Sequence, residues 1–236
     1  MKQQLILLCV LSLFVSCKKE IIDGNRLIDI DPFEKIELND AFELFVSEGN
    51  HYSIEIIGDK KIIDYINVNV INKTLSIDDT RNIKWLSPQK NKIKIYVTSL
   101  PLKKITAAEG CNIQTLTPIT SVECGLVLKG KSNQANLELD CNTFFYWNNF
   151  PSGGKVTLSG KTEMLKIWNF AIMSVDARNL TAQNANIENN SQGDCEVTVL
   201  KKLEYSISEK GNIHLYGNPS EIISNTDSSK RAPLLI

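Results

Sequence analysis

A spacing of twenty residues dominates the second half of the chain. Segments that begin at Cys141, Lys161, Thr181 and Lys201 follow one another at this spacing and share one layout. A layout repeated at a fixed interval is typical of a solenoid, in which each repeat forms one turn and stacks on the next. Apolar and polar residues alternate within the repeats, which favours strands over helices. The sequence therefore predicts a stack of β-strand rungs.

Alignment of the last three repeats places apolar residues in columns, with mostly polar residues such as Asp176 and Glu196 between them. Strands that stack about 4.8 Å apart satisfy their backbone groups and bury such columns. We therefore expect one all-β domain, a single β-solenoid with two strands per rung. The predicted inner columns are Leu165, Ala185 and Tyr205; Ile167, Ile187 and Ile207; Val175, Cys195 and Leu215; and Ala177, Val197 and Gly217.

Short tracts of small and polar residues separate the strands and are expected to form the corners. Glycine and asparagine tolerate the positive φ that tight corners require. The predicted corners are Glu109 to Asn112, Gly130 to Asn133, Pro151 to Gly154, Ser191 to Asp194 and Glu209 to Asn212.

The first half is less regular and is predicted to cap one end of the solenoid. Alternating segments at 33–38, 42–46, 52–57, 67–71, 74–77 and 92–97 are expected to be strands, and Lys60 to Ile66 one or two helical turns. Pro219 and the polar stretch Ser224 to Arg231 would close the other end, because an uncapped edge invites association. Residues 223–236 are expected to be a flexible tail.

The N-terminus has the layout of an export signal. Lys2 precedes the apolar run Leu5 to Val15, which is too short for a permanent membrane span. The run ends in Ser16 and Cys17, an arrangement that resembles a lipobox, so residues 1–16 are predicted to be a signal peptide and 17–31 a tether lipidated at Cys17. Each acyl chain would add roughly 0.8 kcal/mol of membrane affinity per buried CH₂. The prediction is an outer-membrane lipoprotein of the cell envelope, periplasmic or surface-exposed.

Charge and cysteine content exclude some classes of function. The 26 basic residues balance 27 acidic ones, whereas binding to nucleic acid would need a dense basic face. The remaining cysteines, Cys111, Cys124, Cys141 and Cys195, would lie in an oxidising compartment, where three disulfide pairings are possible. The inward phase of Cys195 favours buried free thiols instead. The sequence leaves the disulfide status open.

Three segments carry a resemblance to a known family. Phe33 to Leu38, Ile56 to Asp59 and Gly211 to Pro219 are similar to the pattern of the putative auto-transporter adhesin head domains, also known as head GIN domains. The resemblance covers residues 32–222 and departs at Asn169 to Met173, where bulky residues replace a glycine-rich corner. It implies a solenoid resembling a right-handed parallel β-helix, in an adhesin-like envelope lipoprotein.

Aromatic residues supply the candidate contact site. In the phase of the columns above, Phe144, Tyr146, Trp168 and Phe170 point outward from two successive rungs, and exposed aromatic patches mark contact surfaces. Such rings could stack on sugars, with Asn148, Asn149 and Asn169 hydrogen-bonding to hydroxyls. Two alternatives stay open: a subunit interface, and a register slip that turns the same rings into core residues. Asn169 and Asn189 share a column, which favours an internal asparagine ladder.

Catalysis has few candidates. Asp176 and Glu196 stack on adjacent rungs, and a pair of carboxylates could serve a carbohydrate-active enzyme, a lyase or hydrolase, on this scaffold. They fall in the exposed phase near Lys166 and Arg178, which could screen them. His51 and His214 are isolated, so no metal site, cofactor or catalytic residue is predicted. The leading hypothesis is a non-enzymatic binding or scaffold module for a glycan or an envelope protein, which could also self-associate as a homo-oligomer.

Overall fold

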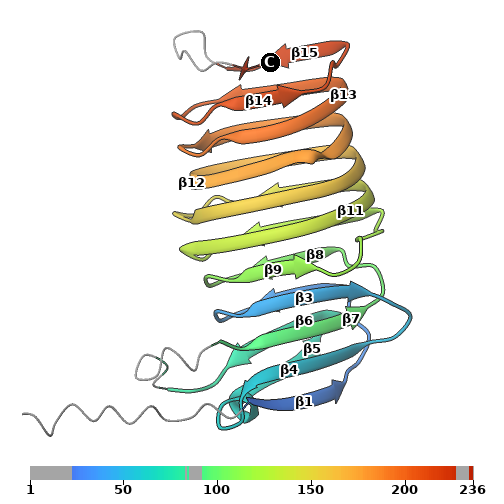
Figure 1. Cartoon of the computed structure of the whole chain (residues 1–236), viewed down its shortest axis with the longest axis vertical. Coiled ribbons are helices and arrows are strands. Elements are labelled where there is room, and N and C mark those ends of the chain that lie inside the picture. Colours follow the sequence, from blue (N-terminus) through green and yellow to red (C-terminus); the bar gives the residue numbers. More distant parts are fainter. Residues whose placement is uncertain (1–22, 83, 85–91, 227–233, 236) are drawn as a thin grey trace, which may run out of the picture.

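The computed structural model describes residues 23–82, 84, 92–226 and 234–235. It is an all-β solenoid of about six turns, stacked from an N-terminal cap to the C-terminal strands (Figure 1). The first strands are β1 (Asp23–Asp29), β2 (Lys35–Leu38), β3 (Glu43–Glu48), β4 (Ser53–Asp59), β5 (Ile66–Ile71), β6 (Thr74–Asp79) and β7 (Lys94–Ser99). The later strands are β8 (Lys104–Ala107), β9 (Asn112–Thr115), β10 (Glu123–Leu128), β11 (Ser132–Trp147), β12 (Gly153–Ser191), β13 (Cys195–Ile207), β14 (Ile213–Tyr216), β15 (Glu221–Ser224) and β16 (Leu234–Leu235).

The stacked strands form two walls that face each other. Wall A contains β7, β3, β9, residues 132–141, 153–162 and 175–182, the first part of β13, β14 and β16. Wall B contains β6, β2, β8, β10, residues 143–147, 164–168 and 184–189, the second part of β13 and β15. The long strands β11, β12 and β13 pass from one wall to the other, and neighbours within each wall are parallel. The predicted β-solenoid is confirmed.

The N-terminal cap departs from parallel stacking. The rung made by β2 and β3 lies between the β6–β7 rung and the β8–β9 rung, so the order in space differs from the order in the chain. Beyond it, β4 pairs antiparallel with β1 and β7, and β5 pairs antiparallel with β6. A short 3₁₀ helix, Ile63–Tyr65, confirms the predicted helical turn. Antiparallel strands close this end because they interrupt the parallel stack.

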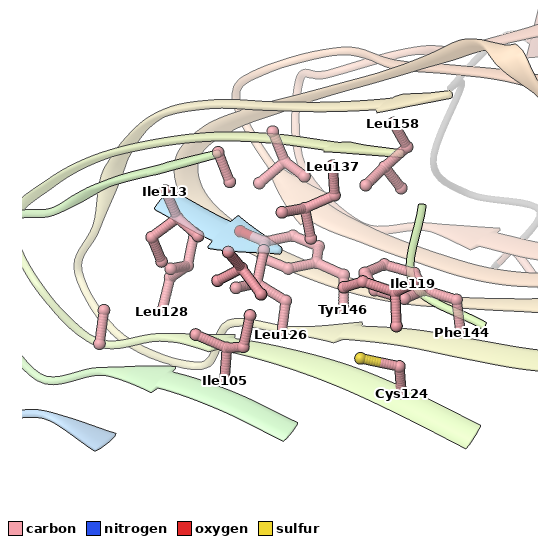
Figure 2. Close-up of a cluster of buried hydrophobic side chains, with 14 of the residues drawn as sticks. Ile105, Ile113, Ile119, Cys124, Leu126, Leu128, Leu137, Phe144, Tyr146 and Leu158 are labelled. Carbon is pink, nitrogen blue, oxygen red and sulfur yellow. The ribbon is translucent and has the colours of Figure 1, made fainter. Parts of the chain in front are cut away.

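The apolar inner faces of the two walls form one continuous core. Cys124, Leu126, Phe144 and Tyr146 from wall B gather with Leu137 from wall A in a cluster of buried side chains (Figure 2). Burial of a large apolar side chain is worth about 1.5–3 kcal/mol, so the columns supply the main drive to stack. The predicted columns are confirmed where Val175 pairs with Cys195 and Ala177 with Val197, and all four residues are buried.

The later members of these columns are shifted by two residues relative to the predicted register. Cys195 pairs with Ile213, Val197 with Leu215, Ile187 with Tyr205 and Asn189 with Ile207, so the local spacing is eighteen residues and not twenty. An even shift keeps Leu215 and Ile207 on the inner side, because side chains alternate with period two. Gly217, predicted to be an inner residue, is exposed.

The corners contain glycine mainly because rungs approach closely. Within the predicted corners, only Gly154 has a positive φ, of 129°. At Gly193 an added Cβ would lie 2.3 Å from the Met173 carbonyl oxygen, and at Gly211 it would lie 2.1 Å from the Gly193 oxygen. The bulky stretch Asn169 to Met173, where the sequence departs from the glycine-rich corner, lies within the continuous strand β12. Ala171 in this stretch has a φ of 63°.

The ends of the chain differ from the sequence prediction where they are described. Residues 23–29 of the predicted tether form β1, and residues 223–224 and 234–235 of the predicted flexible tail belong to β15 and β16. The signal peptide and Cys17 lie outside the described residues. Within the described ranges, no helix is long and apolar enough to span a membrane.

The four cysteines of the solenoid are free and buried, as the inward phase of Cys195 indicated. Burial raises the pKa of the Cys111 thiol to about 11 and that of the Cys195 thiol to about 12. Both groups therefore stay protonated near neutral pH and pack as small apolar side chains.

Candidate ligand-binding groove

The structure divides the predicted aromatic site between the core and the surface. Phe144 and Tyr146 have an exposed fraction of 0%, so the prediction that they point outward is wrong. Trp168 is half-buried on the outer face of wall B, and Phe170 is 39% exposed. The alternative of a register slip, which places these rings in the core, holds for Phe144 and Tyr146.

The physical reason is one extra residue in a rung. Phe144 pairs with Leu165 and Tyr146 with Ile167, a spacing of twenty-one residues. Because side chains alternate between the faces of a strand, an odd spacing reverses the phase that a spacing of twenty predicts. The run from Phe144 to Trp147 is aromatic at every position, so the period-two pattern gives no warning of the reversal.

The outward rings are those of Phe145, Trp147 and Trp168. Trp147 and Trp168 are direct neighbours on adjacent rungs, and the three rings border a groove of about 600 Å³ on the outer face of wall B. This volume lies within the range of roughly 300–1,000 Å³ that is typical of small-molecule sites. The lining consists of Lys35, Ile36, Glu37, Thr74, Lys104, Thr106, Val127, Lys129, Phe145, Trp147 and Trp168.

Close contacts hold two of these rings in place. The Phe145 ring covers Gly125 of the neighbouring strand so tightly that a Cβ there would lie 1.9 Å from the ring. The Trp147 ring meets Phe150 edge to face, with centroids 5.6 Å apart, and the Lys129 Nζ lies 5.9 Å from the Phe150 ring centroid. The aromatic end of the groove is therefore preorganised by packing.

Positive charge gathers at the other end of the groove. Lys35 of β2 and Lys104 of β8 are direct neighbours in the parallel register at this end, whereas Lys129, which follows β10, lies beside Phe150 at the aromatic end. Within the described part of the chain, none of these three lysines forms an ion pair, and Glu37 is the one acidic residue of the lining. Like charges directly opposite each other destabilise a sheet, so the pairing of Lys35 with Lys104 is unfavourable for the fold.

Asparagines stabilise the corner beside the groove and are not available to a ligand there. Asn148 and Asn169 are each 1% exposed. The Asn148 amide donates to the Phe170 carbonyl oxygen at 3.1 Å, and the Asn169 amide donates to the Asn189 side-chain oxygen at 3.1 Å. The predicted asparagine ladder is confirmed, whereas the idea that Asn148 and Asn169 bind sugar hydroxyls is wrong because both are buried.

Comparison with known proteins identifies the family. The family model described as "Putative auto-transporter adhesin, head GIN domain" matches residues 32–219. The chain belongs to this family. The comparison with curated proteins found no significant match to this chain.

Several crystal structures have a similar fold. A protein described as a putative adhesin from Bacteroides fragilis has a TM-score of 0.79 at 18% identity, covering 88% of this chain and 94% of its own. A putative adhesin from Parabacteroides merdae has a TM-score of 0.58 at 17% identity, with coverages of 87% and 94%. A protein from Parabacteroides distasonis described as a putative lipid binding protein has a TM-score of 0.60 at 16% identity, with coverages of 87% and 95%. At these identities the likeness concerns the fold alone.

The candidate catalytic carboxylates of the head GIN domain form ion pairs with cationic side chains. Asp176 and Glu196 are neighbours on wall A, as predicted, but Asp176 is buried and not exposed. Arg178 contacts Asp176 at 2.8 Å and Glu196 at 3.0 Å, and the Lys155 Nζ lies 2.9 Å from Asp176. Hydrogen bonds from Arg178 and Lys155 hold the pKa of Asp176 well below its usual range. A general acid needs a raised pKa, and the two cations shift the pKa of Asp176 in the opposite direction.

Each of the two histidines contacts one polar side chain. His214 Nε2 lies 3.2 Å from an Asp194 oxygen, and His51 Nδ1 lies 3.2 Å from the side-chain oxygen of Asn50. Among the described residues, no group of three or more metal-ligating side chains is found. The groove on wall B is therefore the candidate site that the geometry supports best.

Proposed function

We propose that this head GIN domain is a non-enzymatic binding module that holds a glycan in the groove on the outer face of wall B. The observation that carries the proposal is the row of Phe145, Trp147 and Trp168 along a groove of about 600 Å³. Flat rings offer large contact areas to the apolar faces of sugars, and the packing around them limits the entropy lost on binding. Membership in an adhesin family supports a binding role at the cell envelope.

The proposal includes display of the domain on a membrane by a lipid. The support is the sequence from Lys2 to Cys17, which resembles the signal of a bacterial lipoprotein. Acyl chains on Cys17 would hold the domain at the outer membrane, because two or three chains suffice for stable anchoring. Replacement of Cys17 by Ala tests this part: the variant is expected to leave the membrane fraction and to lose incorporation of labelled palmitate. Full retention of the label would contradict it.

Binding is tested with a glycan array probed with the protein from residue 18 onward and with two matched variants. Trp168→Ala removes a ring from the groove, whereas Tyr96→Ala removes a ring on wall A that stacks on Phe45 with centroids 4.6 Å apart. We expect Trp168→Ala to lose up to about tenfold in affinity for any glycan found, since stacked aromatics contribute on the order of 0.5–1.5 kcal/mol. Tyr96→Ala is expected to bind like the wild type. Equal losses in both variants, or no glycan bound at all, would contradict the proposal.

A further inference from the structure

Within the part of the chain that the structure describes, Lys35 and Lys104 of the groove lack an ion pair, whereas other lysines of the same wall have one. In the adjacent column of wall B, Glu34 lies between two lysines, with its oxygens 2.9 Å from Lys73 and 2.6 Å from Lys103. These two ammonium groups lower the pKa of Glu34 to about 2, so the carboxylate stays charged and offsets both. One residue further along the same strands, Lys35 and Lys104 adjoin without such a bridge.

On wall A, two neighbouring like charges are also contacted by one side chain of opposite charge. Asp176 and Glu196 are direct neighbours, and Arg178 lies within 3.0 Å of both. The fold thus places an opposite charge between like charges at two positions. Among the described residues, no carboxylate forms an ion pair with Lys35 or Lys104, and Glu37, two residues along β2, is the one acidic side chain in the lining of the groove. Both lysines line the groove that a ligand would fill.

We propose that the groove is selective for acidic glycans, whose carboxylate or sulfate groups supply the counter-charge for Lys35 and Lys104. This inference rests on the proposed glycan-binding function and names its ligand class. One sugar ring would stack at the aromatic end, against Trp147 and Trp168, while an acidic group further along the glycan meets Lys35 and Lys104. Charge-assisted hydrogen bonds are about twice as strong as neutral ones, so the lysine end would set the specificity.

The test compares two pairs of probes that differ only in charge. Oligogalacturonate is compared with its methyl ester, and dextran sulfate oligomers with dextran oligomers of equal length, by calorimetry at low salt. We expect at least one acidic probe to bind about tenfold or more tightly than its neutral partner. The difference should shrink at 0.5 M salt, because screening weakens such contacts.

Matched variants assign the charge effect to the groove. Lys104→Gln removes a groove lysine, and Lys94→Gln makes the same change on wall A, where Lys94 pairs in register with Glu43. Lys104→Gln is expected to lose about tenfold in affinity for the acidic probe and little for the neutral one. Its melting temperature should not fall, which shows that the fold is intact. Lys94→Gln should bind both probes like the wild type.

The outcomes separate this inference from the function on which it rests. Equal binding of acidic and neutral probes, with loss in Trp168→Ala, would overturn the selectivity and leave the glycan-binding function standing. Tighter binding of the acidic probe that Lys104→Gln does not alter would also overturn the inference, because the charge effect would lie elsewhere. Absence of binding by all probes, and by a neutral glycan array, would overturn both.

Discussion

The two walls of the solenoid have the same inner construction and different outer faces. On the inside, both present stacked aliphatic and aromatic columns that are almost fully buried. On the outside, the charges of wall A form a connected set from Lys155 through Asp176 and Arg178 to Glu196. The outer face of wall B carries Trp147 and Trp168 together with Lys35 and Lys104, two neighbouring lysines that form no ion pair among the described residues. The difference teaches that the inner columns determine the fold, whereas the outer faces are free to differ in function.

The largest expected effect separates the inside of wall B from its outside. Phe144→Ala should lower the free energy of unfolding by about 3–5 kcal/mol, because it leaves a cavity at a fully buried position. Phe145→Ala, one residue further, should cost about 1 kcal/mol or less, since surface changes rarely cost more. Denaturant titration measures both values. If Phe145→Ala were the more damaging change, the assignment of inner and outer faces would be wrong.

Gly125→Ala should cost about 1 kcal/mol, because the Phe145 ring over it must move to admit a Cβ. The obstructing atoms belong to a side chain that can rotate, so the solenoid should still fold. Affinity for a glycan should fall along with the displaced ring. Circular dichroism and calorimetry together check this pair of results. Unchanged affinity would show that the position of Phe145 does not matter to the groove.

Arg178→Met should make the free energy of unfolding depend less on pH in the acidic range. The pKa of Asp176 is lowered in the folded state, so its charge contributes stability above the unfolded value near 4, and this contribution disappears as the pH falls through the folded pKa. Without Arg178 the cost at pH 7 should be about 1 kcal/mol, and the further loss on acidification below pH 4 should be smaller. Unfolding measured from pH 2 to 7 tests this. Parallel curves for variant and wild type would contradict it.

The smallest effect should occur at the lysine pair of wall B. Lys104→Gln should leave the stability unchanged or raise it by up to about 0.5 kcal/mol, because it removes a repulsion between neighbouring strands. Lys103→Gln, which deprives Glu34 of a partner, should have the opposite sign. Melting curves at low salt give the comparison. A clear loss of stability in Lys104→Gln would mean that the lysine is already compensated.

Much of the fold could be predicted from the sequence, because repetition reports the stacking directly. The spacing of twenty residues and the alternation around Val175 and Cys195 give the inner columns correctly. The change to eighteen residues before Ile213 could not be predicted, because bulges and corners absorb residues without leaving a pattern. The exchange of order that places β2 and β3 between later rungs also has no local signal.

The site was harder to predict than the fold because it depends on whether the number of residues in one rung is odd or even. An interval of twenty-one residues between Phe144 and Leu165 exchanges inside and outside, so the sequence placed Phe144 and Tyr146 on the surface in error. One signal does point to the correct phase: Gly125, whose lack of a side chain makes room for the Phe145 ring, stands opposite that residue in the register. The pairing of Lys35 with Lys104 joins residues that are far apart in the chain, and it follows only from the rung order.

Mapping a bound glycan by NMR chemical-shift changes tests the central claim most directly. With backbone amides assigned and an acidic oligosaccharide titrated in, the largest saturable shifts should fall on the groove strands of wall B, at Lys104 to Thr106, Gly125 to Val127, Phe145 to Trp147 and Trp168. Wall A, including Asp176 and Arg178, should shift little. Saturable shifts centred on wall A, or none on wall B at a concentration where binding is detected, would contradict the account.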